Sequence, residues 1–219
     1  PYFFSVWAAR GGGGVGVFAP PPPPPPRNKH IRRTIMIYMF LAEGFEEIEA
    51  LCPLDLLRRA GLEVRTVGVG GKVVRGAHGI EVIADMTTSE VERIVKKLPC
   101  EMVVLPGGMP GTLNLKADRV VNEFIDRAYD DGKYLAAICA APSILGEKRI
   151  LNGCEAICFP GFEDSLSGAK ISGKSVVRDG NIITAKGMGV ALEFGLELVS
   201  VFCGDEKAME LRASVQAPM

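Results

Sequence analysis

The chain carries almost no excess of either charge and no long apolar run, and both absences exclude classes of partner. Its 25 lysines and arginines nearly balance its 26 aspartates and glutamates, which gives a net charge of −1. Proteins that bind nucleic acids or membrane surfaces usually display a strong basic patch, so we expect neither partner. No apolar run approaches the roughly 18 residues that a membrane-spanning helix needs.

The six cysteines lack the spacing of a zinc site. No Cys-x-x-Cys pair occurs, and Cys154 and Cys158 have neither a histidine nor a second cysteine pair nearby. We therefore predict no metal and no cofactor. Cysteines scattered among apolar segments are typical of reduced thiols in a cytoplasmic protein, and this is the location that we predict.

Histidine is scarce as well, with His30 and His78 as the two examples. Neither follows Cys139, which excludes a peptidase or amidase whose histidine base comes directly after its cysteine nucleophile. His78 lies in a Gly-Ala-His-Gly loop, where a surface histidine is the simplest interpretation. A pairing of His78 with Cys139 stays open.

Residues 1–33 differ in composition from the rest of the chain. The segment contains the glycine run Gly11–Gly14 and the proline run Pro20–Pro26, followed by several basic residues. It shows no hydrophobic period and cannot bury a core. A disordered tail, a targeting sequence and a translation or cloning artefact are the three interpretations. We favour a disordered or artefactual extension, with Met36 as a natural start, and predict one domain over residues 34–219.

Beyond residue 33, short apolar runs alternate with segments of helical periodicity. Strands are predicted at 34–41, 62–69, 72–74, 79–84, 101–105, 133–138, 155–158, 175–178 and 182–185. Helices are predicted at 45–60, 89–97, 117–129, 190–203 and 205–214, and another begins at 142. This alternation predicts an α/β fold, with a mostly parallel sheet that is covered by helices on both faces. Pro53 predicts a bend or a break in the first helix.

Cys139 follows an apolar strand and precedes a helix that opens with small residues, Ala140-Ala141-Pro142. Such a sharp turn raises one side chain above the sheet edge and directs free N–H groups of the helix N-terminus toward it. These groups favour an anion, so we predict a thiol that ionises more readily than a free cysteine. The local pattern alone fits a buried structural cysteine equally well.

Two further features lie where strands of this sheet end, at the edge where such folds form their sites. Gly107-Gly108 lets backbone N–H groups approach a ligand, although an ordinary tight turn also explains the pair. Glu46, Glu47 and Glu49 open the first helix, and we expect the first two to serve the helix dipole or face solvent. Glu49 can point at the strand ends, where a protonated carboxyl beside a thiolate would act as a proton shuttle.

Five stretches of the domain form a specific combination. They are Leu41–Glu49, Asp55–Gly61, Val104–Gly108, Ala136–Pro142 and the Gly187-x-Gly189 turn before a long helix. Together they resemble the DJ-1/ThiJ/PfpI superfamily, in its DJ-1-like branch, over about residues 34–218. The resemblance implies a flavodoxin-like three-layer α/β sandwich, similar to class I glutamine amidotransferases, and a homodimer.

The resemblance also implies roles for individual residues. Cys139 matches the nucleophilic, oxidation-sensitive cysteine of the family, and Glu49 matches the glutamate that bonds to it. Gly108 and Ala140 match the backbone donors beside the sulfur, and Gly107 belongs to the same binding loop. Members are described as glutathione-independent glyoxalases, as protein or nucleotide deglycases and as redox-responsive chaperones.

Several positions depart from what other members carry. The residue after Cys139 is alanine rather than the histidine of the protease-like branch, so we expect no peptidase activity. Phe159 stands where some members have a histidine, which leaves Glu49 as the one obvious proton carrier. Lys186 and His78 stand where others have arginine, which weakens the expectation of anion binding at the site.

Three functional hypotheses follow. In the first, the Cys139 thiolate attacks methylglyoxal, glyoxal or their glycated adducts, backbone N–H groups hold the oxyanion, and Glu49 moves a proton. In the second, Cys139 records oxidation as a sensor or chaperone in the oxidative stress response, without significant turnover. In the third, the domain is catalytically silent and serves interactions alone.

Overall fold

The computed structural model describes residues 35–93 and 99–218. The tail predicted at residues 1–33 lies outside these ranges, as does the end of the helix predicted at 89–97. The domain boundary at residue 34 therefore stays a prediction. Within the described ranges, no helix combines the length and the apolar character needed to cross a membrane.

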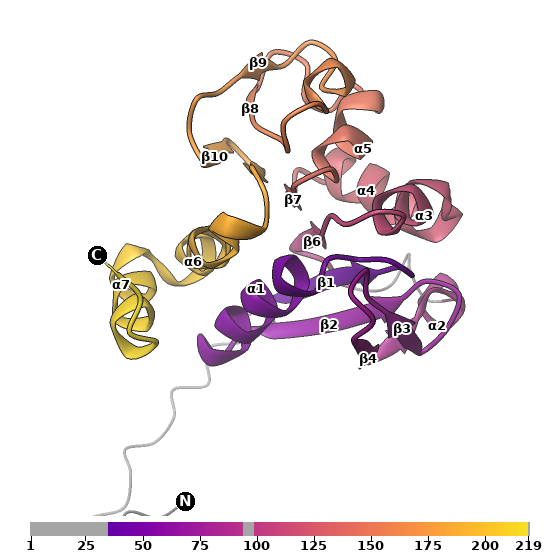
Figure 1. The fold of residues 1–219 in the computed structure, drawn as a ribbon, viewed down its shortest axis with the longest axis horizontal. Helices are drawn as coiled ribbons and strands as arrows, with labels where there is room; N and C mark the ends of the chain where they lie inside the picture. Colours follow the sequence, from indigo (N-terminus) through magenta and orange to yellow (C-terminus); the bar gives the residue numbers. More distant parts are fainter. Residues whose placement is uncertain (1–34, 94–98, 219) are drawn as a thin grey trace, which may run out of the picture. The chain divides into compact units, whose positions relative to one another are not determined.

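A seven-stranded sheet forms the centre of the domain, in the order β10-β11-β7-β6-β1-β2-β5 (Figure 1). Its strands are β1 (Met36–Leu41), β2 (Glu63–Gly68), β5 (Met86–Thr87), β6 (Met102–Leu105), β7 (Tyr134–Ile138), β10 (Val176–Asp179) and β11 (Ile182–Ala185). Strand β10 is antiparallel to β11, and the other neighbours in the sheet pair in parallel. The predicted mostly parallel sheet is confirmed.

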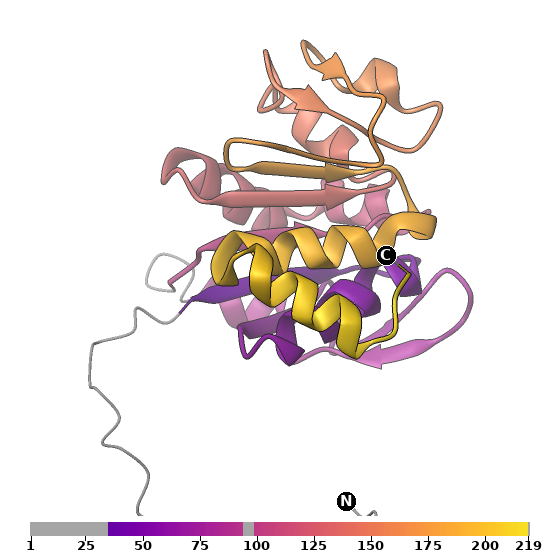
Figure 2. The same ribbon diagram turned by 90° about the vertical axis from the view of Figure 1, so that its left-hand side faces the viewer.

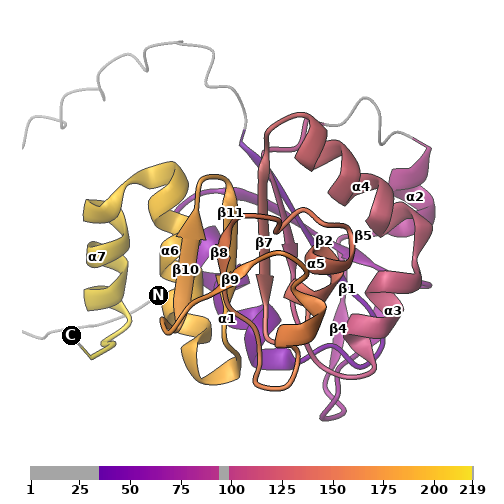
Figure 3. The ribbon, with the colours of Figure 1, turned by 90° about the horizontal axis from the view of Figure 1, so that it is seen from above.

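Helices cover both faces of this sheet because successive side chains of each strand point to opposite faces. In β1, Ile37 and Met39 pack in one core, whereas Tyr38 and Phe40 pack in the other. The first core is covered by α1 (Glu47–Arg59), α6 (Ala191–Cys203) and α7 (Asp205–Ser214). The second is covered by α2 (Thr88–Glu92), α3 (Gly111–Ala117), α4 (Arg119–Asp130) and α5 (Pro142–Glu147). Figures 2 and 3 show α6 and α7 on the same side of the sheet, so the predicted three-layer α/β sandwich is confirmed.

Two small sheets flank the central one. An antiparallel hairpin joins β3 (Val73–Arg75) to β4 (Glu81–Ile83), and β8 (Glu155–Ala156) pairs in parallel with β9 (Lys170–Ile171). The strand predicted at 155–158 is thus shorter than expected and lies outside the central sheet. Both edges of its neighbour β11 are already paired, with β10 and β7, so the apolar run finds no free edge there. The N–H of Ile157 donates instead to the Thr184 hydroxyl, at 3.0 Å.

Helix α1 differs from its prediction in two respects. The helix continues through Pro53. Pro53 packs against Gly195 of α6, and a Cβ on that glycine would lie 2.9 Å from the Pro53 Cα. The apolar residue Ile48, within the helix predicted at 45–60, is 49% exposed rather than buried. Asp55, seven residues later and thus on the same face of the helix, is exposed as well. The buried face of α1 lies elsewhere and includes Leu57.

Some local features escaped the sequence analysis. Helix α3 and strand β5 were not predicted, and α2 begins at Thr88, one residue before the predicted start at residue 89, with Thr87 as its cap. The Thr87 hydroxyl accepts from the N–H of Glu90, and the Glu90 carboxylate accepts from the N–H of Thr87 at 2.7 Å. This capping box has a sequence signature, threonine followed three residues later by glutamate, which could have placed the cap.

Candidate active site

Four adjacent strands bring the candidate residues to one edge of the sheet. Cys139 directly follows β7, the glycine pair follows β6, Glu49 lies in the first turn of the helix after β1, and Gly187 follows β11. Because β11, β7, β6 and β1 are neighbours, their carboxyl ends form a single site. The structure thus brings together five of the residues singled out from the sequence: Glu49, Gly107, Gly108, Cys139 and Ala140.

The Cys139 backbone adopts a strained turn, with φ of 65° in the left-handed region that non-glycine residues avoid. Two hydrogen bonds hold it there. Its N–H donates to the carbonyl of Ala185 at 2.9 Å, and its carbonyl accepts from the N–H of Phe159 at 2.8 Å. The following Ala140 and Ala141 are buried, so small side chains fit the turn. The geometry is that of a nucleophile elbow, as the strand-to-helix pattern predicts.

Backbone donors and one carboxyl surround the Cys139 sulfur. The N–H groups of Gly108 and Ala140 donate to it, and the Glu49 carboxyl is hydrogen-bonded to it. Gly107 fits between these groups because it has no side chain. A Cβ at that position would lie 2.6 Å from the Cys139 Cβ and 2.6 Å from Glu49 Oε2. The glycine pair is therefore more than an ordinary tight turn.

Glu49 is a buried carboxyl, only 1% exposed. Its Oε2 accepts from the N–H of Gly107 at 3.0 Å, and the N–H of Met188 donates to it as well. Burial raises the pKa of Glu49 to about 7, against the lowering effect of these bonds and of the bond with Cys139. At neutral pH the carboxyl is therefore balanced between its two protonation states.

Burial also raises the pKa of Cys139, to about 12, and the charge of Glu49 adds to that rise. The N–H groups of Gly108 and Ala140 act in the opposite direction, as expected for the elbow. The prediction of an easily ionised thiol is thus wrong while Glu49 is ionised, because burial and a like charge outweigh two dipoles. Once Glu49 holds a proton, the like charge is gone and its O–H can donate to the sulfur. The pair accommodates one negative charge.

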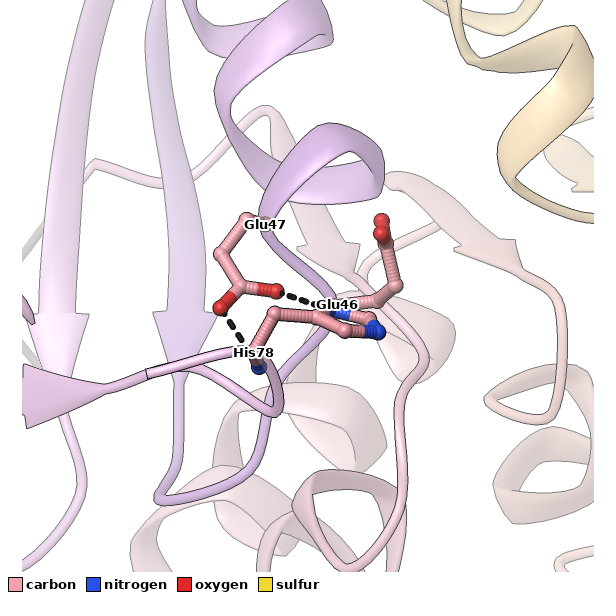
Figure 4. A group of neighbouring side chains, drawn as sticks. All are labelled: Glu46, Glu47 and His78. Atoms are coloured by element: carbon pink, nitrogen blue, oxygen red, sulfur yellow. Dashed lines mark hydrogen bonds and ion pairs between the residues drawn. The ribbon is translucent and has the colours of Figure 1, made fainter. Parts of the chain in front are cut away.

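The other two glutamates of the first turn have separate tasks (Figure 4). The Glu46 carboxylate accepts from the N–H of Glu49 at 2.7 Å and caps α1. Glu47 is 3% exposed rather than solvent-facing, and it accepts from the backbone N–H groups of His78 and Ile80 and from His78 Nδ1, at 2.7, 3.4 and 2.8 Å. The bond with Glu47 raises the pKa of His78. Glu47 therefore braces the loop of residues 76–80 against α1.

Glu46, Glu47 and His78 each offer one ligand atom within 4.8 Å of the others. The hydrogen bonds described above already account for this proximity, so the cluster needs no ion to explain it. The absence of a metal stays a prediction. A role of His78 at Cys139 also stays a prediction, because the contact that the structure gives the ring is with Glu47.

Met188 and Phe159 donate backbone N–H groups to Glu49 and Cys139, respectively. Neither donor was predicted from the sequence. The Gly187-x-Gly189 turn was a signal for Met188, since a glycine-rich strand end lets N–H groups approach a ligand. Phe159 was noted as a departure from a family pattern, but its bond to the Cys139 carbonyl depends on a loop path that local sequence does not specify.

These features define a class of protein: an α/β sandwich with a cysteine elbow and a buried carboxyl at the carboxyl edge of its sheet. Residues 35–201 match the family model described as DJ-1/PfpI family. Protein DJ-1 homolog B of Arabidopsis thaliana is 36% identical over 174 residues, which cover 78% of this chain. They cover 39% of the plant protein, so the match extends over well under two thirds of that relative's length.

In two further comparisons, the match covers most of both proteins. The glutathione-independent glyoxalase DJR-1.2 of Caenorhabditis elegans is 32% identical over 171 residues, 77% of this chain and 89% of that protein. A solved structure of oxidised Toxoplasma gondii DJ-1 has a TM-score of 0.79 at 30% identity, covering 84% of this chain and 100% of that one. The chain belongs to the DJ-1/PfpI family and has its flavodoxin-like α/β fold.

Replacing Glu49 with its neutral isostere, Glu49→Gln, should change how stability depends on pH. A carboxyl whose pKa rises from 4.5 to about 7 on folding stabilises the fold below pH 4.5 and loses that contribution as the pH passes through 7. Relative to Glu49→Gln, the wild type should therefore lose about 3 kcal/mol between about pH 4.5 and pH 8.

Denaturant unfolding at several pH values across this window measures the difference. The exposed Glu63→Gln is the matched control and should follow the wild type. Parallel stability curves for wild type and Glu49→Gln would show that Glu49 does not titrate in this range.

Proposed function

We propose that this protein is a cysteine-dependent, glutathione-independent glyoxalase- or deglycase-type enzyme that acts on methylglyoxal, glyoxal or their adducts. The observation that carries the proposal is the buried Glu49 carboxyl, hydrogen-bonded to the Cys139 sulfur beside two backbone N–H donors. The name of the Caenorhabditis elegans relative supports the same activity. Peptidase activity is not part of the proposal, since a histidine base is lacking next to the elbow.

The reaction begins on the pair with its proton on Glu49. The Cys139 thiolate attacks the aldehyde carbon of methylglyoxal, forming a C–S bond and moving the carbonyl electron pair onto oxygen. The N–H groups of Gly108 and Ala140 then hold this oxyanion, as they hold the sulfur anion before the attack. Protonation of the oxyanion by Glu49 gives a neutral hemithioacetal and leaves a carboxylate beside it.

Glu49 then moves a proton between the two carbons of the adduct. The carboxylate removes the proton of the former aldehyde carbon, and the electron pair moves onto the neighbouring carbonyl oxygen to give an enediolate. The hydroxyl proton passes to that oxygen, and Glu49 returns its proton to the neighbouring carbon. The former aldehyde carbon thus becomes the carbonyl of a lactoyl thioester. One carbon is oxidised and the other reduced, so no external oxidant is needed. Water hydrolyses the thioester, the C–S bond breaks, and lactate leaves with the thiol restored. A carboxyl with a pKa of about 7 suits such a two-way transfer.

Deglycase activity would use the same steps on an adduct of the aldehyde with an amine or a thiol. The Cys139 sulfur forms its bond to the carbon of the adduct while the bond to the amine or thiol breaks, and the released group takes the proton. The product is the same hemithioacetal, after which Glu49 acts as before. One site thus accounts for both substrate types.

The first test is lactate formation from methylglyoxal without glutathione. Cys139→Ala should abolish turnover because the nucleophile is removed, and Glu49→Gln should lower kcat by roughly 100-fold or more because the proton carrier is removed. Cys154→Ala is the matched control, since Cys154 is also partly buried but donates to the carbonyl of Ile150 away from the elbow. Full activity of Cys139→Ala or of Glu49→Gln would overturn the mechanism.

Redox sensing is a second candidate function, which would explain why a partly exposed sulfur is hydrogen-bonded to a carboxyl. A peroxide oxidises the thiolate in two steps, each transferring one oxygen to sulfur and releasing water, and the Glu49 O–H can donate to the resulting sulfinate. The similar Toxoplasma gondii DJ-1 is described in its solved structure as oxidised, which supports this alternative.

Peptide mass spectrometry after mild peroxide treatment tests sensing. Cys139 should gain two oxygen atoms before the other partly buried cysteines, Cys52, Cys154 and Cys203, react. Equal oxidation of all four sites would exclude a sensor role. Selective oxidation in a protein that forms no lactate would favour sensing over catalysis.

We also propose a homodimer, with the exposed side of α1 as its surface. Ile48 is 49% exposed on this side, next in sequence to the catalytic candidate Glu49. Ile48→Lys should shift the full chain from dimer to monomer in sedimentation equilibrium, whereas Ile171→Lys, at a comparably exposed isoleucine, should leave it unchanged. A monomeric wild type would refute the proposal. The cytoplasmic location stays a prediction.

A further inference from the structure

Three large apolar side chains stand exposed around the cysteine elbow. Met109, Phe159 and Met188 are 47%, 47% and 53% exposed. Each is tied to the reactive pair through the backbone. The N–H of Phe159 donates to the Cys139 carbonyl, the N–H of Met188 donates to Glu49, and Met109 follows the glycine whose N–H donates to the sulfur. The backbones of these three residues therefore lie beside the reactive pair.

The Phe159 ring stands close to the catalytic carboxyl. A Cβ on Gly187 would lie 3.2 Å from Phe159 Cδ2 and 4.0 Å from Glu49 Oε1. Because Gly187 has no side chain, space remains between the Phe159 ring and the Glu49 carboxyl. A substituent on an aldehyde bound to Cys139 can contact the ring there while its reacting carbons remain within reach of the carboxyl.

The charges that act on the pair are negative. Glu49 raises the pKa of Cys139, and Glu46 raises that of Glu49. A substrate with its own carboxylate would bring a second negative charge beside the buried Glu49 carboxylate.

We propose that the ring of Phe159 makes the site selective for neutral 2-oxoaldehydes with an apolar or aromatic substituent, and that the buried Glu49 carboxyl disfavours anionic aldehydes such as glyoxylate. This substrate class rests on the proposed function and specifies it further. Phe159 is the specificity-determining residue because its ring lies beside the carboxyl, across the position of Gly187.

Alkylation of Cys139 tests the selectivity without any turnover. The probes are iodoacetamide, N-benzyliodoacetamide and iodoacetate, with rates read by peptide mass spectrometry and divided by those of a small free thiol. The benzyl reagent should react about 3- to 10-fold faster than iodoacetamide on this scale, as an aromatic contact with Phe159 predicts. Iodoacetate should react more slowly than iodoacetamide.

Two variants of Phe159 and one control assign the effect. Phe159→Ala should bring the ratio of benzyl to iodoacetamide rates down to that of the free thiol, and Phe159→Lys should raise the relative rate of iodoacetate. Tyr129→Ala should keep the wild-type ratios, since this aromatic is 49% exposed near the end of α4, just before β7 begins at the opposite edge of the sheet. A wild type without benzyl preference, or Phe159→Ala retaining it, would overturn the inference.

Turnover of phenylglyoxal, methylglyoxal and glyoxylate separates this inference from the function on which it rests. Turnover of methylglyoxal with no preference for phenylglyoxal over glyoxylate would leave the function standing and refute the selectivity. No turnover of any aldehyde, together with the predicted alkylation ratios, would refute the enzyme and support a site that selects neutral apolar groups.

Discussion

The site depends on one hydrogen bond, between a buried carboxyl and a partly exposed sulfur. Two anions cannot coexist there, because burial and mutual repulsion each oppose the second charge. Cys139 and Glu49 therefore share a proton, and whichever group gives it up carries the charge. This constraint couples ionisation of the thiol to protonation of Glu49, because the thiol resists ionisation while Glu49 is charged. The surrounding N–H donors are divided between the two groups, so either position of the proton is stabilised.

Close packing brings the Glu49 carboxyl and the Cys139 sulfur together. Gly107 leaves room for the sulfur and the carboxyl to meet, whereas a single methyl group would occupy the same space as both. Glu46 fixes the start of α1 through the N–H of Glu49 itself, which orients the helix turn that carries the carboxyl. On the far side of the same turn, Glu47 and His78 attach the neighbouring loop. Three acidic residues in the first turn thus serve as a cap, as a brace for the loop and as the hydrogen-bonding partner of the Cys139 sulfur.

Local patterns predicted the parts of this site that local physics determines. The apolar runs indicated the strands, the small residues after Cys139 predicted the elbow, and the strand-end glycines predicted the donors. Glu47 was placed wrongly because its burial depends on a loop about thirty residues away, and no periodicity records that contact. The direction of the Cys139 pKa was also wrong, since the helix N-terminus is a local feature whereas desolvation depends on the whole assembled edge. Long-range packing determines both the burial of Glu47 and the direction of the Cys139 pKa shift.

The residues of the site come from widely separated positions in the chain, and this has a consequence while the protein is being synthesised. The carboxyl comes from position 49, one pair of donors from 108 and 140, and the last donor from 188, on four different strand ends. A nascent chain that has just emerged past Cys139 still lacks Met188 and the strand β11 that holds the elbow in place. Until then, the Ala185 carbonyl and the Met188 N–H are missing from the surroundings of Cys139 and Glu49, so the site is complete only when nearly the entire domain has been synthesised.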